Sequence, residues 1–383
     1  MRRLLLSYLF CFTCVIAFSQ KRTLQWPDSI YTGKQGNFHI QGFTLDSANG
    51  FIYASFTNKL LKLNLRGEVL GSVIGIVGHL GDLEFNANDG KIYASLEYKN
   101  DAIGKGINVS LGLEHTVSTS FYIAVIDATQ ITKQDMHVDS VDILTGIYLH
   151  DVVQDYEAEM EVGNKKIKHR YGCSGIDGIT FAPALGGKDS KSKYLYLAYG
   201  IYGDTTRIDN DYQVLLKFDV SEINSYARPM NQYNLHQSGP NSALEKYFVK
   251  TGNTRYGIQN LSYDSHSGNL YAAVYKGAKS SYSNFDLFVI SGHKKPLKMD
   301  YVIDGVKKQV STITLVKSGT KDKSGEIYGW YFKWGATGIQ SLGNGLFYIS
   351  QQGKAEDGQQ YSNIVKYKWV GDSKTAFVKF ENK

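Results

Sequence analysis

The sequence predicts an all-β protein, a single β-propeller built of four-stranded blades. Two observations lead to this prediction. A phrase made of an inner strand, a tight turn and a second strand recurs five times, starting at His39, His79, Gly175, Gly257 and Gly338. Such units bury their faces only against neighbouring copies. The composition, with 28 Tyr, 39 Gly and only 5 Pro, suits short strands joined by tight turns.

The first residues are set apart from this repeat. Arg2 and Arg3 precede an apolar run over 4–18, and Ala17-Phe18-Ser19 fits a cleavage site. This pattern predicts a secretory signal peptide over 1–19, too short for a membrane anchor. The propeller domain is then expected over 20–383, because the phrase continues through the chain with no linker rich in Pro or Ser. We expect a secreted or periplasmic protein.

The strands within each repeat follow from local patterns. Asx-Gly and Ser-Gly steps, such as Asn49-Gly50, supply the positive φ of a hairpin turn. The second strand carries Tyr between small and apolar residues, as in Ile52-Tyr-Ala-Ser55. Third strands are expected at 60–65, 121–126, 214–219, 287–290 and 364–369. Candidate fourth strands are 69–74, 138–144, 247–251, 310–316 and 376–380.

Aligned on the inner strand, the five phrases share one anchor position, occupied by Gln41, Gly81, Asp177, Gln259 and Gln340. Five blades are therefore visible, and a sixth, degenerate blade within 128–172 or 293–334 stays open. The segment 24–32 resembles the strand that precedes other anchors. We expect it to pair with the C-terminal strands and close the ring.

Long connections gather on one predicted face of the ring. In a four-stranded blade, the turn before strand one and the turn between strands two and three share a face. The segments in these places are long, at 99–118, 201–211, 276–284, 353–361, 146–174 and 221–256. Loops on a rigid scaffold often carry function. The functional site is therefore expected on this face, at the mouth of the channel.

Polar residues at the anchor position suggest a metal site. Carboxylate and amide oxygens suit Ca²⁺ or another divalent ion, and the expected ligands are Asp82, Asp177, Gln259 and Gln340. A channel filled with water explains polar anchors equally well.

The remaining candidate residues surround these anchors. His39 and His79, each two residues before an anchor, are the candidate catalytic acid and base. The residues expected to contact a substrate are Gln41, Glu97, Tyr98, Tyr199 and Tyr256.

Charge and cysteine content limit the partners. The net charge of +6 becomes +4 without Arg2 and Arg3, and no basic stripe interleaved with aromatics appears, so nucleic-acid binding is not expected. After cleavage Cys173 is the only cysteine left, which excludes an intramolecular disulfide. We expect a monomer that binds a small molecule or a glycan and has no membrane anchor.

One stretch carries a resemblance to known proteins. Gly175-Ile-Asp-Gly-Ile-Thr-Phe-Ala-Pro183, followed by Tyr194-Leu-Tyr-Leu-Ala198, resembles the blade phrase of secreted propellers in the strictosidine-synthase, gluconolactonase and NHL-repeat group. In that group an Asn or Asp at the start of the inner strand often binds a channel calcium. The resemblance implies that Asp177 is a metal ligand.

Two functions remain open at this point. The first is a metal-dependent hydrolase or lyase acting on a small ester, lactone, phosphoester or glycan, with the metal polarising the substrate oxygen. The second is a non-catalytic propeller that binds a glycan or a protein. The sequence slightly favours the hydrolase.

Overall fold

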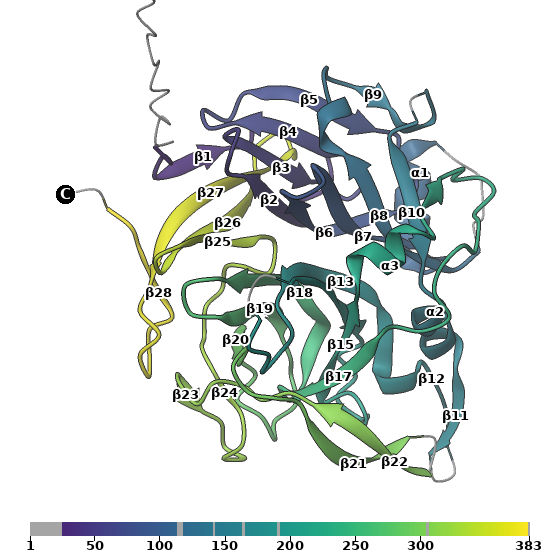
Figure 1. Cartoon of the computed structure of the whole chain (residues 1–383), viewed down its shortest axis with the longest axis vertical. Coiled ribbons are helices and arrows are strands. Elements are labelled where there is room, and N and C mark those ends of the chain that lie inside the picture. Colours follow the sequence, from purple (N-terminus) through teal and green to yellow (C-terminus); the bar gives the residue numbers. More distant parts are fainter. Residues whose placement is uncertain are drawn as a thin grey trace, which may run out of the picture.

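The computed structural model describes residues 25–112, 118–140, 142–162, 165–189, 192–303 and 306–381. Five β-sheets stand around a central channel (Figure 1), which confirms the predicted propeller and gives five blades rather than six. The predicted signal peptide lies outside the described residues. Within those residues, no helix is long and apolar enough to cross a membrane.

Each blade is an antiparallel meander whose first strand lines the channel. Blade 1 consists of β2 (Gly42–Asp46), β3 (Phe51–Ser55), β4 (Leu60–Asn64) and β5 (Val69–Ile74). Blade 2 consists of β6 (His79–Asn86), β7 (Lys91–Tyr98), β8 (Ser120–Asp127) and β10 (Leu144–Tyr148). Blade 3 consists of β13 (Cys173–Ala182), β14 (Tyr194–Ile201), β15 (Tyr212–Phe218) and β17 (Glu245–Lys250).

Blades 4 and 5 are less regular at their outer edges. Blade 4 consists of β18 (Thr254–Asp264), β19 (Asn269–Lys276) and β20 (Leu287–Ile290). Isolated bridges from β20 to Leu315 and Trp330 take the place of its fourth strand. Blade 5 consists of β25 (Ile339–Gly343), β26 (Leu346–Lys354), β27 (Gln360–Trp369) and β28 (Phe377–Lys379).

Short elements decorate the ring. Three strands or strand pairs extend the blade edges: β9 (Met136–His137), β16 (Arg228–Pro229) and the hairpin of β21 (Leu297–Ile303) with β22 (Val306–Thr312). Two small hairpins stand apart, namely β11 (Glu159–Val162) with β12 (Lys165–Lys168), and β23 (Thr320–Lys321) with β24 (Tyr328–Gly329). The helices are α1 (Ala102–Leu111), α2 (His150–Glu157) and α3 (Val220–Asn224), with 3₁₀ turns at Ala128–Gln130, Val138–Ser140 and Arg170–Gly172.

Aromatic side chains fill the spaces between blades. The tyrosine of the repeated second-strand phrase is almost fully buried in all five blades, as Tyr53, Tyr93, Tyr196, Tyr271 and Tyr348. Several of these rings contact a phenylalanine of the next blade: the ring centroids of Tyr93 and Phe181 lie 5.2 Å apart, and those of Tyr271 and Phe347 lie 4.7 Å apart. The repeat therefore encodes the interfaces between blades as well as the strands.

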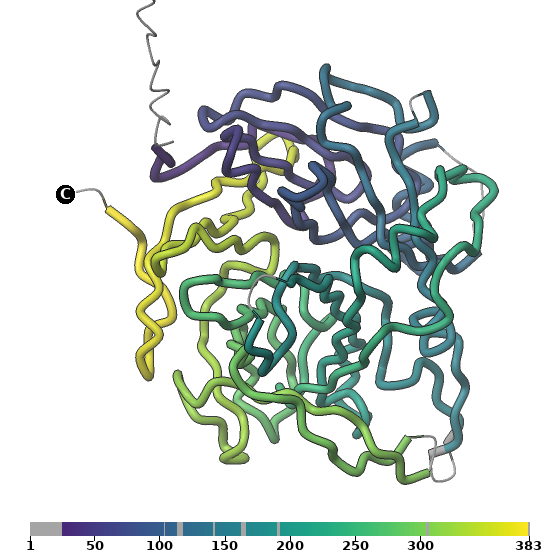
Figure 2. Tube along the Cα trace, in the orientation of Figure 1, coloured from purple at the N-terminus to yellow at the C-terminus, as the bar shows by residue number. Residues whose placement is uncertain are grey.

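The N-terminal strand closes the ring as predicted. Strand β1 (Ser29–Tyr31) pairs antiparallel with β27, with Ile30 opposite Ile364. Figure 2 shows the purple N-terminal segment beside the yellow C-terminal strands. This pairing adds the N-terminal strand to the sheet of the last blade and so ties the two ends of the chain together.

This closure should contribute measurably to stability. The Ile30 side chain is 2% exposed, so replacing it with Ala should lower the free energy of unfolding by about 2–5 kcal/mol. Urea denaturation measures this change, and Ser29→Ala at an exposed neighbouring position is the control. A change below about 0.5 kcal/mol for Ile30→Ala would mean that the ring holds together without β1.

Two predicted outer strands and one predicted loop position differ from the structure. The fourth strand of blade 2 is β10, and the segment predicted for it begins with a 3₁₀ turn, Val138–Ser140. The segment predicted as the fourth strand of blade 4, 310–316, is divided between two blades: the end of β22 pairs in parallel with β17 of blade 3, while Leu315 bridges to Ile290 in β20 of blade 4. Much of 221–256 connects β15 to β17, on the side away from the predicted mouth. Elaboration is therefore not confined to one face.

Candidate functional site

Two layers of inward-facing residues determine where a ligand can enter the channel. The layer farther from the predicted mouth contains one residue per blade, each opposite the repeated tyrosine: Thr44, Glu84, Thr180, Ser262 and Gln340. The Glu84 carboxylate accepts hydrogen bonds from Thr44 Oγ1 at 3.2 Å, Thr180 Oγ1 at 3.1 Å and Gln340 Nε2 at 3.1 Å. One side chain thus joins four blades.

This layer corrects the placement of Gln340. Gln340 lines a cavity of about 560 Å³ at the opposite end of the channel, bordered by the turns between strands one and two. Gln340 lies opposite Tyr348 just as Thr44 lies opposite Tyr53, so the two residues occupy equivalent positions in their blades. The anchor position in blade 5 is therefore Thr337, three residues before Gln340, and Gln340 does not join the other predicted ligands.

The next layer blocks the channel with Asp82 and Asn260. Asp82 Oδ2 accepts hydrogen bonds from the backbone N–H groups of Ile179 and Leu261, both at 3.0 Å. Asn260 Nδ2 donates to the backbone oxygens of Gln41 at 2.7 Å and Ala336 at 3.1 Å. Asp82 thereby connects blade 2 to blades 3 and 4, and Asn260 connects blade 4 to blades 1 and 5. Asp82 is 2% exposed and belongs to the floor of the site.

Glycines at this layer make room for the two polar side chains. A Cβ atom at Gly42 would lie 2.5 Å from Asp82 Oδ1 and 3.3 Å from Asn260 Oδ1. The matching position in blade 5 is Gly338, whose φ of 146° also disfavours larger residues. Burial raises the pKa of Asp82 well above its ordinary value, although the two backbone N–H groups oppose this effect.

Above this floor a cavity of about 650 Å³ opens toward the predicted face. We call it the mouth cavity. Seven of the residues proposed from the sequence line it: His39, Gln41, His79, Glu97, Asp177, Tyr256 and Gln259. The structure thus brings these seven side chains to one cavity.

A buried ion pair occupies one wall of the mouth cavity. Lys99 Nζ lies 2.7 Å from Glu97 Oε2 and donates to the backbone oxygen of Ser174 at 2.9 Å. Glu97 Oε1 accepts the N–H of Ile176 at 2.5 Å. Burial alone would lower the pKa of Lys99, but the carboxylates of Glu97 and Asp101 outweigh it and hold this pKa above its ordinary value. Burial raises the pKa of Glu97, while the charge of Lys99 and the N–H of Ile176 oppose this effect. Because Lys99 Nζ lies 2.7 Å from its carboxylate, we take the two side chains as an ion pair.

His79 lies beside this pair. Its Nδ1 atom is 3.7 Å from Glu97 Oε2, is buried, and has no hydrogen-bond partner among the described residues. Burial, followed by the charges of Lys99 and His39, lowers the pKa of His79 to about 3. The imidazole is therefore neutral at physiological pH.

The second histidine is held differently. His39 Nε2 lies 3.4 Å from Gln41 Nε2, which also donates to Thr57 Oγ1 at 2.8 Å. Burial lowers the pKa of His39 as well. Because Gln41 rather than a carboxylate faces this ring, His39 lacks a partner that would stabilise its protonated form.

Asp177 completes the reactive groups of the mouth cavity. Its Oδ1 accepts the backbone N–H of Asp82 at 3.3 Å. Burial, and next the charge of Glu97, raise the pKa of Asp177 well above its ordinary value. Glu97 and Asp177 are thus two neighbouring carboxyl groups in different states, one ionised beside a lysine and one favouring the protonated form.

Two predicted substrate contacts are wrong. Tyr98 and Tyr199 are 1% and 0% exposed and do not line the mouth cavity. The Tyr199 hydroxyl donates to Asp155 Oδ2 at 2.9 Å, and that of Tyr98 points to Gln232 Oε1 at 3.3 Å. Side chains alternate along a strand, so the neighbour of a cavity residue points away from the cavity. Tyr98 follows Glu97 and Tyr199 precedes Gly200, and both tyrosines therefore pack between blades.

The positively charged side chains of the mouth cavity were not predicted from the sequence. Lys99, Arg255, Lys276 and Lys333 line it, together with Asp286. Lys99 had a signal, because it stands two residues after Glu97 and leaves the strand on the same side. The others come from loops and strand ends of blade 4 or its neighbours, where no repeated phrase marks them.

The predicted divalent-ion site does not fit these positions. Gln340 lies beyond the blocked layer, Asp82 is engaged with two backbone N–H groups, and only Asp177 and Gln259 face the cavity. The described part of the chain contains no group of three or more His, Cys, Asp or Glu arranged to hold a metal. No chemical step is therefore assigned below to an ion held by these four residues.

Comparison with known proteins gives distant structural similarities. No family model and no curated protein matches the chain. Among solved structures, it is similar to the β-propeller domain of Swd1 from Myceliophteria thermophila, with 10% identity, a TM-score of 0.30 and coverage of 85% of this chain and 83% of that one. It is also similar to a protein provisionally described as a gluconolactonase, with 11% identity, a TM-score of 0.30 and coverage of 88% and 92%.

Proposed function

We propose that the mouth cavity is the active site of a hydrolase that cleaves a small ester or lactone. One observation carries the proposal: a neutral imidazole, a buried Glu97–Lys99 ion pair and a carboxyl group with a raised pKa line the same open cavity. Buried titratable groups with perturbed pKa values are costly to fold, and they concentrate at functional sites.

His79 is the general base in this proposal. Its neutral ring takes a proton from a water molecule, whose oxygen then forms a bond with the substrate carbonyl carbon. The Glu97 carboxylate, 3.7 Å away, stabilises the imidazolium that results. Lys99 and the N–H of Ile176 keep this carboxylate in place, in the way an orienting group supports a catalytic base.

Asp177 is the general acid. When the bond between the carbonyl carbon and the leaving oxygen breaks, the carboxyl group of Asp177 gives its proton to that oxygen. The proton that His79 took from water then passes to the Asp177 carboxylate, and both side chains are back in their starting states. In a lactone the leaving oxygen stays attached, so the product is one hydroxy acid. The negative carboxylate product suits a cavity lined by Arg255, Lys276 and Lys333.

Replacing Asp177 with Asn should separate activity from stability. Without the acidic proton, kcat should fall by about 10²–10⁴-fold. The folded protein binds the Asp177 proton more tightly than the unfolded chain, so the wild type loses stability as pH rises above the ordinary Asp range. The variant lacks this loss. Its melting temperature should exceed that of the wild type by roughly 2 °C or more at pH 8, and the gain should vanish below pH 4.

Kinetics on an aryl ester and thermal scans at several pH values measure both effects. Equal activity of Asp177→Asn and wild type would remove Asp177 from the mechanism. A melting temperature that drops at all pH values would instead show that the charged carboxylate stabilises the fold.

We also propose that the protein is exported and that residues 1–19 are removed. Mass spectrometry of the protein recovered outside the cytoplasm should find a chain that begins at Gln20. An uncut N-terminus in that fraction would contradict cleavage at this site.

A further inference from the structure

A second cavity lies next to the mouth cavity on the same face. Its volume is about 1,020 Å³, and we call it the side cavity. Three residues line both cavities: Arg255, Tyr256 and Lys276. The far side of the side cavity is formed by the segment 202–209 and by residues 167–169. Because these three residues line both cavities, the two cavities form one continuous surface. We call the region around Arg255, Tyr256 and Lys276 the junction.

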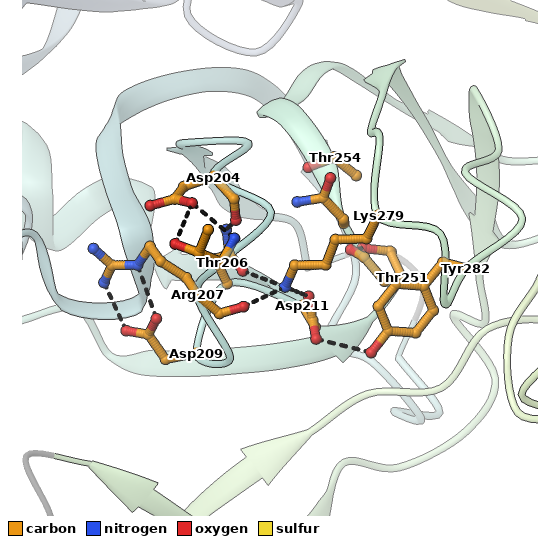
Figure 3. Close-up of polar contacts among 12 residues, drawn as sticks. Asp204, Thr206, Arg207, Asp209, Asp211, Thr251, Thr254, Lys279 and Tyr282 are labelled. Carbon is orange, nitrogen blue, oxygen red and sulfur yellow. Dashed lines mark hydrogen bonds and ion pairs between the residues drawn. The ribbon is translucent and has the colours of Figure 1, made fainter. Parts of the chain in front are cut away.

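The far wall of the side cavity is fixed by buried polar contacts (Figure 3). The Lys279 side chain is buried, and its Nζ donates to the backbone oxygen of Arg207 at 2.6 Å and to Asn210 Oδ1 at 2.8 Å, while it pairs with Asp211. The Arg207 guanidinium forms a two-pronged contact with Asp209, at 2.9 and 2.7 Å. This loop is therefore held in one shape, as a preformed binding wall requires.

The junction carries positive charge that is open to a ligand. The cations deeper in the side cavity have carboxylate partners, with Arg207 paired to Asp209 and Lys168 to Glu159. Among the described residues, no carboxylate lies within ion-pair distance of Arg255 or Lys276, although both line the two cavities. Arg255 instead rests over the Tyr256 ring, 5.6 Å from its centroid. The charge of Lys276 acts on the Asp286 carboxyl group, which also lines the mouth cavity. Arg255, Lys276 and Lys333 still outnumber this single carboxyl group, so the junction favours an anionic group.

Tyr256 presents its ring at this junction at the cost of backbone strain. Its φ is 64°, a left-handed conformation that is unfavourable for a bulky aromatic residue. Gln259 Nε2 donates to the Tyr256 backbone oxygen at 2.8 Å and holds the turn, and the ring remains 39% exposed. Strain of this kind collects where a side chain has a ligand to meet. Tyr202 offers a second, half-buried ring in the side cavity.

We propose that the hydrolase substrate is an acidic oligosaccharide derivative that spans both cavities. Its sugar rings lie over Tyr256 and Tyr202, a carboxylate lies between Arg255 and Lys276, and the bond to be cleaved lies in the mouth cavity. Tyrosine rings combine an apolar face with a polar edge, which suits the faces and hydroxyls of sugars. This inference rests on the proposed function for the position of the reacting bond, and on the side cavity for the length and charge of the substrate.

Binding experiments test the substrate class independently of catalysis. Trigalacturonate, galacturonate and methyl-esterified trigalacturonate are titrated calorimetrically into the wild type, Ala278→Trp, Lys276→Gln and Lys308→Gln. Ala278 is an exposed residue of the side cavity, and Lys308 is an exposed control on the β21–β22 hairpin. The wild type and Lys308→Gln should bind trigalacturonate at least ten-fold more tightly than galacturonate.

The variants should remove this preference in different ways. Ala278→Trp should bind both acids alike while keeping the affinity for galacturonate, because only the side cavity is filled. Lys276→Gln should bind trigalacturonate about as weakly as its methyl ester. Equal wild-type affinities for one and three units, or for acid and ester, would overturn the proposal. No binding of any saccharide, with aryl-ester hydrolysis intact, would overturn the substrate class and leave the hydrolase standing.

Discussion

His79→Asn should lower kcat for ester hydrolysis by about 10²–10⁴-fold, the contribution expected of a positioned general base. Asparagine keeps a polar group of similar reach, so the cavity is neither filled nor emptied by much. The imidazole has no hydrogen-bond partner among the described residues at Nδ1, so little folding energy depends on it. We expect the melting temperature to change far less than the rate.

The pH dependence of the wild type gives this prediction a second readout. A base works only when it is unprotonated, and the pKa of His79 is lowered to about 3. The value of kcat/KM should therefore show no fall near pH 6.5 and should decline only as pH approaches 3. His266→Asn, in an exposed turn at the other end of the channel, is the matched control and should keep wild-type rates. Full activity in His79→Asn would remove this residue from the mechanism.

Asp82→Ala should be among the most destabilising single changes in the channel. It leaves the buried N–H groups of Ile179 and Leu261 without an acceptor, which costs about 1–3 kcal/mol for each. Asp82→Asn should behave differently, since an amide oxygen accepts the same two hydrogen bonds. The raised pKa of Asp82 also means that the carboxylate is costly at neutral pH, so Asn should match or exceed the wild-type stability there.

Urea denaturation of the three proteins at pH 7 distinguishes a structural Asp82 from a metal-binding one. If Asn destabilises the protein as much as Ala does, a charged carboxylate is required at this position, and the assignment of Asp82 to the floor of the site is wrong. Adding and removing Ca²⁺ in the same experiment should leave the wild-type midpoint unchanged.

The fold was predictable because its signal is repeated. Five similar phrases identified the blades, and the shared tyrosines pack between them. The error at Gln340 came from aligning blades 4 and 5 on their shared letters Gly-Ile-Gln. In the register of the repeated tyrosines, Gln340 lies opposite Tyr348 and Ser262 lies opposite Tyr271, whereas Gln259 lies three residues before Ser262. Identical letters in blades 4 and 5 therefore occupy layers three residues apart.

The candidate site was only partly readable for a related reason. Residues at the ends of inner strands, such as His79 and Asp177, were found because the repeat gives their position and direction. Arg255 and Lys276 lie outside the part of the phrase that repeats, and the pairing of Lys99 with Glu97 depends on burial that a sequence does not display. Tyr98 was wrongly assigned to the site for the opposite reason: it stands next to a site residue in the sequence, but its side chain faces the core.

The most direct test of the account is the turnover of lactones and aryl esters by the purified wild-type protein, followed with and without the hydroxy acid product. We expect hydrolysis of at least one member of the panel, inhibited competitively by the product, because substrate and product both occupy the mouth cavity. No turnover of any lactone or ester, or turnover that the product does not inhibit, would contradict the assignment of this cavity as a hydrolytic site.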